Sequence, residues 1–576
     1  MKKLLALLMT LALVASCASA LAEVPSYVNL DSACPAVKEG TEDVTISILT
    51  TRNSTATNDI EDVWFFQYLA EAMNVTLELE QTLETQERIS LMFAADEVAD
   101  LVWGIGLSNN DVMTYGVEEG MLLKWNDLLT PELMPNACKA REEYPDAFVA
   151  ATAPDGNIYA LPEITGSRYH ANTGSFSAAI RMYINQDWLD QCGLAMPETL
   201  DDFLNVLRAF KEKDPAGLGD QLIPMVGNQN KDKEFVWNAL GFYGRNTNQW
   251  GTAWEIKDGE VVLPCYTEEA REFITFYHTL YEEGLISPDY FTMDQTTARG
   301  LIGSGVCGVF GDSTIGSLGD NWAAWDALSP LTSDMNDTAV ASMNNTFNTG
   351  MCYASAYTEH PEVLARIVDY MYSAEGAALY FYGPMKGGDK PLYNVDGWYL
   401  DENGKVTTDK VVNGEYSDIS EYTYQFIKSY SSAPGRYDLL PQEVCRMAGT
   451  EYQGDVRIIT DKLTGATVQS TVMDVVIDDN NDGHWRTIQS NALVDNLTTI
   501  RLPGVYLTAE QNQRVADLST VINDHVTAET AKFIVGTRSL DELDAYFAEL
   551  KKLGIEEYIQ IYRDAYAGFT ATLPKE

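Results

Sequence analysis

The sequence predicts an α/β protein built from at least two lobes, and three observations support this prediction. The chain has 576 residues, which is too long for a single ordinary domain, because domains typically hold about 100–200 residues. Its composition is 45% hydrophobic, 21% charged and 11% aromatic, which is typical of globular proteins. Residues 44–104 alternate short strand patterns with amphipathic helix patterns. Such a β-α-β-α-β run favours a doubly wound, largely parallel sheet.

The run begins with a strand in VTISIL, residues 44–49, where apolar and polar side chains alternate. A helix is predicted from about Asp59 to Met73, with Asn58 as its N-cap and an end near Asn74. Three further elements follow in order: a strand in VTLELE (75–80), a helix at 86–95 and a strand in ADLVWG (99–104).

Later helices are marked by their end signals. In PETLDDFLNVLRAF, Thr199 is the predicted N-cap with Asp202 at the third helical position, and the helix stops at Asp214-Pro215. The remaining signals are a hairpin turn at Asp258-Gly259, a helix capped by Thr267 and ended by Gly284, and a capping box of Ser539 and Glu542.

Residues 1–22 form an export signal, with Lys2 and Lys3 before an apolar run that is too short for a committed membrane span. Two processing sites remain open. Ala20-Leu21-Ala22 fits release, whereas Val14-Ala15-Ser16-Cys17 is similar to a lipobox, in which Cys17 carries the lipid. The mature protein is therefore expected outside the cytoplasm, either released or lipid-anchored.

Charge and cysteine spacing exclude several functions. A formal net charge of −47 repels phosphate backbones and anionic lipid surfaces, so nucleic acid is a poor partner. The eight cysteines show no Cys-x-x-Cys spacing, which argues against a zinc site, and their scatter does not indicate a disulfide framework. No metal and no cofactor are predicted.

A set of stretches in a fixed order resembles the extracellular solute-binding proteins, family 1, of bacterial ABC importers, and most closely the large LplA-type lipoprotein group. They are RISLMFAADEVADLVWG, DGNIYALPE, YINQDWLDQCGLAMPETLDDFLNVLRAFKEKDP, YTEEAREFITFYHTLYEEGLISPDYF, ARIVDYMYSAEGAALYFYG and TAKFIVGTRSLDELDAYFAELKKLGIEEYIQIY. Each stretch alone is weakly diagnostic, but the ordered set is specific.

The resemblance implies the type II periplasmic-binding-protein fold, in which two α/β lobes joined by a hinge hold the ligand in an interlobe cleft. Lobe 1 is then expected at residues 43–165 with about 340–400, and lobe 2 at 166–339 with about 401–576. Hinge closure around the ligand is what the permease of such an importer detects. The working form is expected to be a monomer.

Two stretches of the sequence bear on calcium binding. Relatives often carry an oxygen-rich calcium loop after the FKEKDP-like segment, but here Ala216 and Leu218 stand where ligand oxygens are needed. DDNNDGHWRTIQ, from Asp478, has the oxygen pattern and sixth-position glycine of an EF-hand loop, yet ends in Gln489 in place of the bidentate glutamate. An acidic surface turn is the favoured interpretation of that stretch.

Candidate ligand-binding residues follow strands, because loops at the carboxyl ends of parallel strands gather at the binding edge of an open α/β sheet. Sugars offer hydroxyls to planar polar side chains and C–H faces to aromatic rings. The candidates are Arg52, Asn53, Trp103, Glu163, Arg168, Trp237, Trp250, Asp312, Trp322 and Asn345. For the tryptophans the alternative is a core role, and for Glu163 it is a turn or hinge hydrogen bond.

Two functions from different classes remain open at this stage. The first is a binding protein that captures a carbohydrate, in particular an oligosaccharide, and presents it to an ABC permease; a peptide or another solute is the alternative ligand. The second is a secreted carbohydrate-active enzyme with paired carboxylates. The absence of GxSxG, HExxH and P-loop motifs, together with the resemblance, favours the binding protein over an enzyme.

Overall fold

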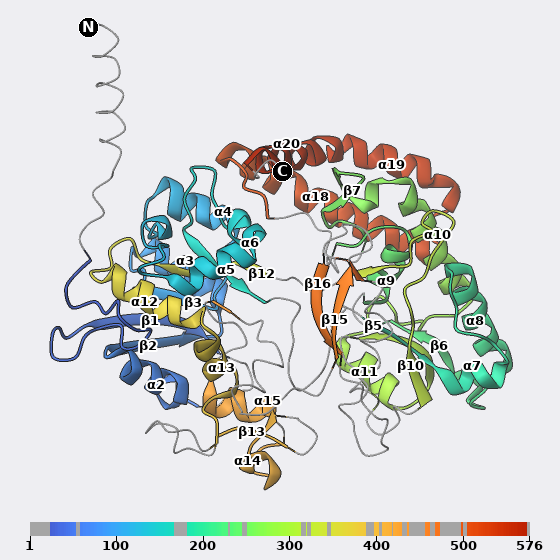
Figure 1. Ribbon diagram of the computed structural model, residues 1–576. Helices are drawn as coiled ribbons and strands as arrows, with labels where there is room; N and C mark the ends of the chain where they lie inside the picture. The colour runs from blue at the N-terminus through green and yellow to red at the C-terminus, as the bar shows by residue number, and fades with distance from the viewer. Residues whose placement is uncertain are drawn as a thin grey trace, which may run out of the picture. The chain divides into compact units, whose positions relative to one another are not determined.

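The computed structural model divides the chain into two units (Figure 1). Unit 1 comprises residues 1–164, 348–399 and 407–437, and unit 2 comprises residues 165–347, 400–406 and 438–576. The structure describes residues 24–52, 58–165, 181–227, 231–244, 250–312, 318, 324–342, 347–386, 397–401, 406–417, 419–428, 435–436, 455–460, 467–472, 497–498 and 504–572.

Unit 1 is organised by a five-stranded sheet in the order β2-β1-β3-β12-β4. β1 runs parallel to both of its neighbours, whereas β12 runs antiparallel to β3. The strands are β1 (Thr45–Thr51), β2 (Thr76–Thr82), β3 (Leu101–Trp103), β4 (Ala160–Ile164) and β12 (Phe347–Ala354). The run predicted at residues 44–104 is therefore present, and a strand from much later in the chain completes the sheet.

Helices surround this sheet, and one helix caps another. The carboxylate of Asp369 accepts backbone N–H bonds from Asn136 (2.8 Å) and Ala137 (2.9 Å), which places a negative charge at the N-terminus of α5. The helices of unit 1 are α2 (Trp64–Met73), α3 (Thr85–Ala94), α4 (Asn109–Asp111), α5 (Pro135–Glu143), α6 (Pro145–Ala150), α12 (Pro361–Met371), α13 (Ala374–Tyr382), α14 (Asp409–Val412) and α15 (Ile419–Tyr422). Two 3₁₀ segments, η1 (Ile60–Asp62) and η3 (Trp125–Asp127), and two π-helical segments, η2 (Val112–Glu118) and η8 (Thr423–Ile427), complete the unit.

The first helix begins later than the sequence predicts. Residues Ile60–Asp62 form a separate 3₁₀ turn, and Val63 is extended (φ −73°, ψ 119°), so α2 starts at Trp64. Asn58 does not cap it, because its side chain donates instead to the carbonyl oxygen of Gln425. The predicted end is confirmed, since Asn74 adopts the left-handed conformation with φ 55°.

The boundary between the lobes also differs from the expectation. The sequence assigns everything after about residue 401 to lobe 2, but residues 407–437 belong to unit 1. Tertiary packing is the reason: Ile427 is fully buried and its side chain occupies the space beside Gly383, where no Cβ would fit. The N–H of Ile164 also bonds to the carbonyl oxygen of Gly435 (2.7 Å).

Unit 2 contains a four-stranded sheet in the order β10-β5-β9-β6. β6 and β9 are parallel, whereas β5 is antiparallel to both β9 and β10. These strands are β5 (Arg181–Asn185), β6 (Ile223–Val226), β9 (Cys307–Asp312) and β10 (Trp325–Ala327). Both faces of the sheet are buried: Val309 packs into a core with α7, α8, α9 and α10, while Phe310 packs on the opposite face near α11.

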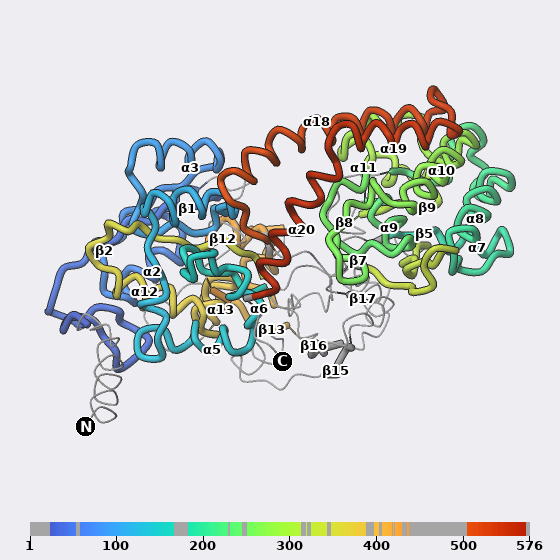
Figure 2. Tube along the Cα trace, turned by 90° about the horizontal axis from the view of Figure 1, so that it is seen from above, coloured from blue at the N-terminus to red at the C-terminus, as the bar shows by residue number. Residues whose placement is uncertain are grey.

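The helices of unit 2 are α7 (Gln186–Cys192), α8 (Leu200–Lys213), α9 (Lys231–Ala239), α10 (Glu268–Glu282), α11 (Gln295–Gly303), α18 (Ala509–Ile534), α19 (Leu543–Lys552) and α20 (Ile555–Thr572), with turns η4 (Gly219–Gln221), η5 (Pro264–Tyr266) and η9 (Leu540–Glu542). Figure 2 shows α18 and α19 alongside α10. Short strand pairs complete the described elements: β7 (Glu255–Lys257) with β8 (Glu260–Val262), β11 (Ala341–Ser342) with β17 (Leu497–Thr498), β13 (Tyr399–Leu400) with β14 (Val406–Thr407), and β15 (Asp455–Thr460) with β16 (Thr467–Val472).

Most local end signals are confirmed in unit 2. Thr199 and Asp202 form the predicted capping box of α8, which ends at Asp214 with φ 44°. The hairpin turns at Asp258 and Gly259, both with positive φ. Thr267 occupies the N-cap position of α10 but makes no capping bond there, since its hydroxyl donates to the carbonyl oxygen of Pro264 (2.9 Å).

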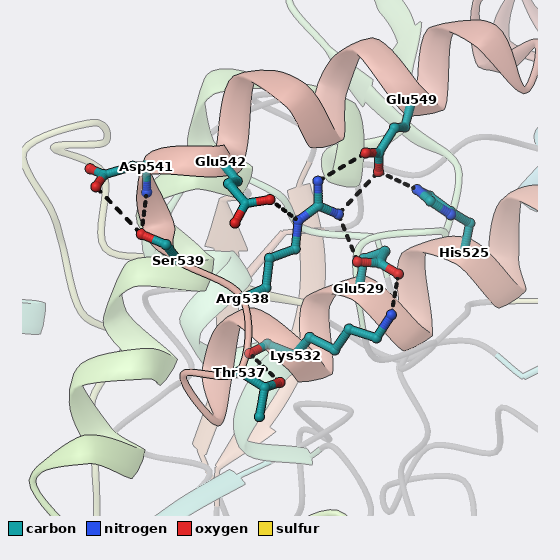
Figure 3. Close-up of polar contacts among 9 residues, drawn as sticks. All are labelled: His525, Glu529, Lys532, Thr537, Arg538, Ser539, Asp541, Glu542 and Glu549. Carbon is teal, nitrogen blue, oxygen red and sulfur yellow. Dashed lines mark hydrogen bonds and ion pairs between the residues drawn. The ribbon is translucent and has the colours of Figure 1, made fainter.

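The predicted capping box at Ser539 and Glu542 is wrong. Ser539 caps the 3₁₀ turn η9, where its hydroxyl accepts from the N–H of Asp541 (3.3 Å), and α19 begins only at Leu543. Glu542 faces Arg538 instead (3.5 Å). Arg538 also pairs with Glu529 and Glu549 (Figure 3). The Glu542 side chain therefore joins this ion-pair network and does not bond back to the N-terminus of the helix.

Candidate functional site

The carboxyl edge of the unit 1 sheet is one candidate site. β1, β2 and β3 are parallel and in register, with Thr51 opposite Thr82 and Thr50 opposite Trp103, so their carboxyl ends share one edge. β12 enters at the same edge, because Cys352 pairs with Trp103 and the earlier residues of β12 extend beyond that strand end. In open α/β sheets this edge is where ligands bind.

Two of the predicted residues directly follow this edge. Arg52 comes immediately after β1 and is half-buried. It therefore keeps part of its guanidinium-bearing side chain available at the sheet edge. The preceding Thr51 is fixed by a hydroxyl bond to the carbonyl oxygen of Thr82 (2.9 Å), which orders the end of β1. The neighbouring candidate Asn53 lies outside the described residues.

Glu163 is placed where the chain passes between the two units. It is 1% exposed on β4, and its carboxylate accepts a hydrogen bond from the amide of Asn348 (2.7 Å). The chain leaves unit 1 after Ile164 and returns to it at Asn348, so this bond joins the two crossing segments within unit 1. The bond gives Glu163 a structural link from β4 to β12, and its predicted ligand-binding role stays a prediction.

Trp103 fills the interior of unit 1 and offers no surface to a ligand. The residue has no exposed surface, and its indole stacks on Phe66 (5.3 Å between ring centroids, 23°) and meets Tyr380 edge-on (6.2 Å, 85°). The stacking role predicted for Trp103 is therefore not supported by its position. The physical reason is that β3 lies between β1 and β12, so its end is covered by aromatic side chains of the surrounding helices.

The carboxyl edge of the unit 2 sheet is a separate candidate site, and Asp312 ends β9 there. Asp312 is fully buried, and its carboxylate receives bonds from Lys231 Nζ (2.6 Å) and from Arg299 Nε (3.1 Å). Burial alone raises the pKa of this carboxyl, but the bonds from Arg299 and Lys231 outweigh it and hold the pKa below its ordinary value. Asp312 thus remains charged and orients two cations at the edge.

Lys231 and Arg299 are not among the binding residues that the sequence predicts. Lys231 opens α9, five residues after β6 ends at Val226, so the same rule that selected Asp312 also selects it. Arg299 lies on α11, and its side chain is 41% exposed while Asp312 anchors it. No sequence signal marks this residue, because its role depends on where α11 packs against β9.

A buried polar cluster lies at the start of α9. The Asp232 carboxylate accepts from the hydroxyls of Tyr277 (2.8 Å) and Tyr290 (2.5 Å), and all three side chains are less than 10% exposed. Burial, with the adjacent Asp232 charge, raises the pKa of both tyrosines well above the ordinary value. Burial lowers the pKa of Lys233 to about 8, although Asp232 acts in the opposite direction.

Trp237 and Trp250 belong to the core of unit 2, which corrects their predicted role as ligand platforms. They are 7% and 6% exposed. Trp237 stacks on Phe273 (4.1 Å, 5°), and Trp250 stacks on Phe291 (6.0 Å, 21°). Trp237 lies on α9, which is buried from Asp232 to Ala239, and both tryptophans belong to the same core cluster as Phe273 of α10.

Several predicted residues lie outside the described part of the chain. These are Asn53, Arg168, Trp322 and Asn345 among the ligand candidates, Cys17 as the lipidation candidate, and the EF-hand-like loop at 478–489. Their roles stay predictions.

The loop after α8 does not fit calcium. Both oxygens of Asp214 are engaged by the loop itself, since they accept from the N–H groups of Leu218 (2.8 Å) and Gly219 (2.8 Å). Ala216 provides no oxygen in its side chain. Within the described ranges, no three His, Cys, Asp or Glu side chains gather as a metal site requires. In the same ranges, no helix has the length and apolarity to cross a bilayer.

Comparisons with known proteins now bear on this architecture. A family model described as bacterial extracellular solute-binding protein matches residues 53–378. The fructooligosaccharide ABC transporter substrate-binding protein FusA of Streptococcus pneumoniae serotype 4 (strain ATCC BAA-334 / TIGR4) is 26% identical over 493 residues, which cover 84% of this chain and 83% of FusA. These matches confirm the resemblance that the ordered sequence stretches indicate.

Solved structures show a similar fold. FusA of S. pneumoniae in complex with kestose matches with a TM-score of 0.67 and 22% identity over 92% of this chain and 100% of that chain. An HMO-binding, ABC-transporter-associated solute-binding protein from Bifidobacterium longum infantis ATCC 15697 matches with a TM-score of 0.70 and 20% identity over 92% of this chain and 100% of that chain. The α/β solute-binding-protein fold predicted from the sequence is thereby confirmed.

Proposed function

The chain belongs to the bacterial extracellular solute-binding proteins, and on this premise we propose that it captures a carbohydrate, in particular an oligosaccharide, and delivers it to the permease of an ABC importer. The observation that carries the proposal is the relationship to the fructooligosaccharide-binding FusA across 84% of the chain. The polar carboxyl edges of both sheets support it, because charged and amide groups there suit sugar hydroxyls.

The protein acts by binding, with no chemical change in its ligand. FusA and the HMO-binding neighbour are binding proteins by name. Ligand capture uses the chain crossings at 164–165 and 347–348 as the hinge, and the working form is a monomer.

The protein is held at the outer face of the cytoplasmic membrane by a lipid on Cys17, if that cysteine is processed, and is otherwise released after Ala22. Detergent phase partitioning of the exported protein distinguishes the two. The wild type is expected in the detergent phase, and Cys17→Ala in the aqueous phase; a wild type in the aqueous phase contradicts the anchor and leaves the binding function standing.

The binding function is tested by isothermal titration calorimetry and thermal shift with the purified mature protein. The ligands are kestose, nystose, an HMO mixture, fructose, sucrose, a dipeptide set and spermidine. Saturating oligosaccharide is expected to raise the melting temperature, since a ligand that binds only the folded state stabilises it. Chromatography of each sugar after overnight incubation is expected to show it unchanged. Stabilisation by peptides or spermidine alone, or any cleaved product, contradicts the proposal.

A further inference from the structure

The loop of residues 287–294 lies at the carboxyl edge of the unit 2 sheet. The segment before it pairs with β6 in parallel: Ile286 bridges Met225, and the N–H of Met225 bonds to the carbonyl oxygen of Leu285 (3.0 Å). A chain parallel to β6 and β9 emerges where those strands end. The loop therefore shares its edge with Asp312 and leads directly into α11, which carries Arg299.

Phe291 in this loop is an exposed aromatic ring with a fixed position. It is 37% exposed, whereas Trp237 and Trp250 are below 10%. One side of its ring packs against Trp250, and Tyr290 meets it edge-on (5.4 Å, 87°). Ordering an unsupported phenylalanine ring at the surface would cost conformational entropy. The Phe291 ring is instead held by its contacts with Trp250 and Tyr290.

A buried polar scaffold fixes the two supporting rings. The Tyr290 hydroxyl donates to Asp232 (2.5 Å), and Lys233 Nζ lies 4.2 Å from the ring centroid of Trp250 and 4.6 Å from that of Tyr290. Asp232 also has one oxygen, Oδ1, with no hydrogen-bond partner among the described residues. Burying charged groups costs stability unless they are well paired, so this cluster is poorly explained by stability alone.

The close approach of Tyr290 to β6 depends on Gly227. A Cβ at Gly227 would lie 2.1 Å from the Tyr290 ring, which is closer than carbon atoms approach. The absence of a side chain after β6 thus leaves room for the ring at the sheet edge. Gly227 fixes the height of Tyr290, and through it the position of Phe291.

We propose that Phe291 is an aromatic platform on which one sugar ring of the transported carbohydrate stacks, with Trp250 and Tyr290 as its positioning residues. This inference rests on the proposed function. Pyranose and furanose rings present an apolar C–H face, which an exposed and rigid aromatic ring binds with little loss of conformational entropy. Lys231 and Arg299, at the same edge, supply donors for the hydroxyl groups of that sugar.

The test measures dissociation constants by calorimetry for kestose, nystose and the HMO mixture, with the wild type and three variants. Phe291→Ala is expected to weaken binding about 10-fold, which corresponds to one aromatic contact. Phe291→Tyr keeps the ring and is expected to bind within about 3-fold of the wild type. Val521→Ala, which removes an apolar side chain 49% exposed on α18 of the same unit, is the control and leaves the constant unchanged.

The possible outcomes distinguish failure of the Phe291 platform from failure of the proposed carbohydrate-binding function. A wild type that binds none of these sugars overturns both proposals. A wild type that binds, with Phe291→Ala equally tight, overturns the platform and leaves the function standing. To exclude a folding defect, the melting temperature of each ligand-free variant is measured. If Phe291→Ala and Phe291→Tyr have equal melting temperatures and only Phe291→Tyr keeps the affinity, the ring acts by contact with the ligand.

Discussion

At the scale of the residue, unit 2 contains both side chains whose position the sequence predicts and side chains whose position it does not. Asp312 was predictable because it ends a strand, and strand ends gather at one edge. Trp237 and Trp250 were not, because the same sequence pattern fits an aromatic ring that faces solvent or the core. Phe291 lies in a stretch that carries the family resemblance, but its exposure depends on the pairing of Leu285 with β6, which is a non-local contact.

Lys233 gives the first prediction, which concerns pH. Its folded-state pKa of about 8 lies below the ordinary 10.5, so the cost of burying its charge is fully present below pH 8. Between pH 8 and 10.5 the unfolded chain keeps a proton that the folded protein has released, and stability therefore rises with pH. The wild type is expected to gain on the order of 2–3 kcal/mol relative to Lys233→Met over this range.

The measurement is urea unfolding at intervals from pH 7 to 10.5 for both proteins. Lys552→Met, which removes an exposed lysine of α19, is the control and keeps the wild-type profile. If the free energies of unfolding of the wild type and Lys233→Met run parallel across this range, the lysine does not lose its proton in the folded protein.

At the scale of the element, helix ends were predictable where the capping partners are close in sequence. Thr199 and Asp202 are three residues apart, and their capping box is present. Asn58 and Ser539 have the right residue types, but distant partners redirect the local geometry: Asn58 bonds to Gln425, and Glu542 joins the network of Arg538. Capping signals thus identify α8 correctly and misplace the starts of α2 and α19.

Arg538 gives the second prediction. Its guanidinium bonds to Glu529 (2.6 Å) and twice to Glu549 (3.0 Å each), and it joins the end of α18 to α19 (Figure 3). Its side chain is 10% exposed. Arg538→Lys keeps the charge but loses the planar fork, so the free energy of unfolding is expected to fall by about 1–3 kcal/mol.

Arg514→Lys is the matched control, since Arg514 also makes a two-pronged pair, with Glu557, but both partners are exposed. An exposed pair contributes roughly 0–1 kcal/mol. Chemical denaturation at low and high salt compares the two variants. If both variants lose the same free energy of unfolding, burial of the Arg538 network does not strengthen its contribution to stability.

At the scale of the whole molecule, the order of the lobes along the chain was largely predictable, but the late return to unit 1 was not. The sequence places the first two crossings near residues 165 and 340 and a third near 400; the structure places the first two after Ile164 and before Asn348, and adds a return to unit 1 at residues 407–437. Residues 407–437 were misassigned because their periodicity is weak. Their attachment to unit 1 depends on packing such as that of Ile427 beside Gly383, which no local pattern encodes.

The third prediction concerns the independence of the two cores. Leu69 in unit 1 and Leu280 in unit 2 are both fully buried, and truncating a buried leucine to alanine costs about 2–5 kcal/mol. Hydrogen exchange with mass spectrometry on the ligand-free protein is expected to show faster exchange in α2 and its neighbours for Leu69→Ala, and in α10 and α18 for Leu280→Ala. Uniform acceleration across both units by either variant would show a single cooperative body.

The place of β12 has a consequence for biogenesis. This strand lies between β3 and β4, yet about 180 residues separate it from β4 along the chain. A polypeptide that is exported N-terminus first therefore presents β3 and β4 with bare hydrogen-bonding edges until the whole intervening stretch has been translocated. Slow secretion would prolong the interval in which these strand edges can pair with another chain. An extracytoplasmic chaperone that covers strand edges would reduce this risk of aggregation.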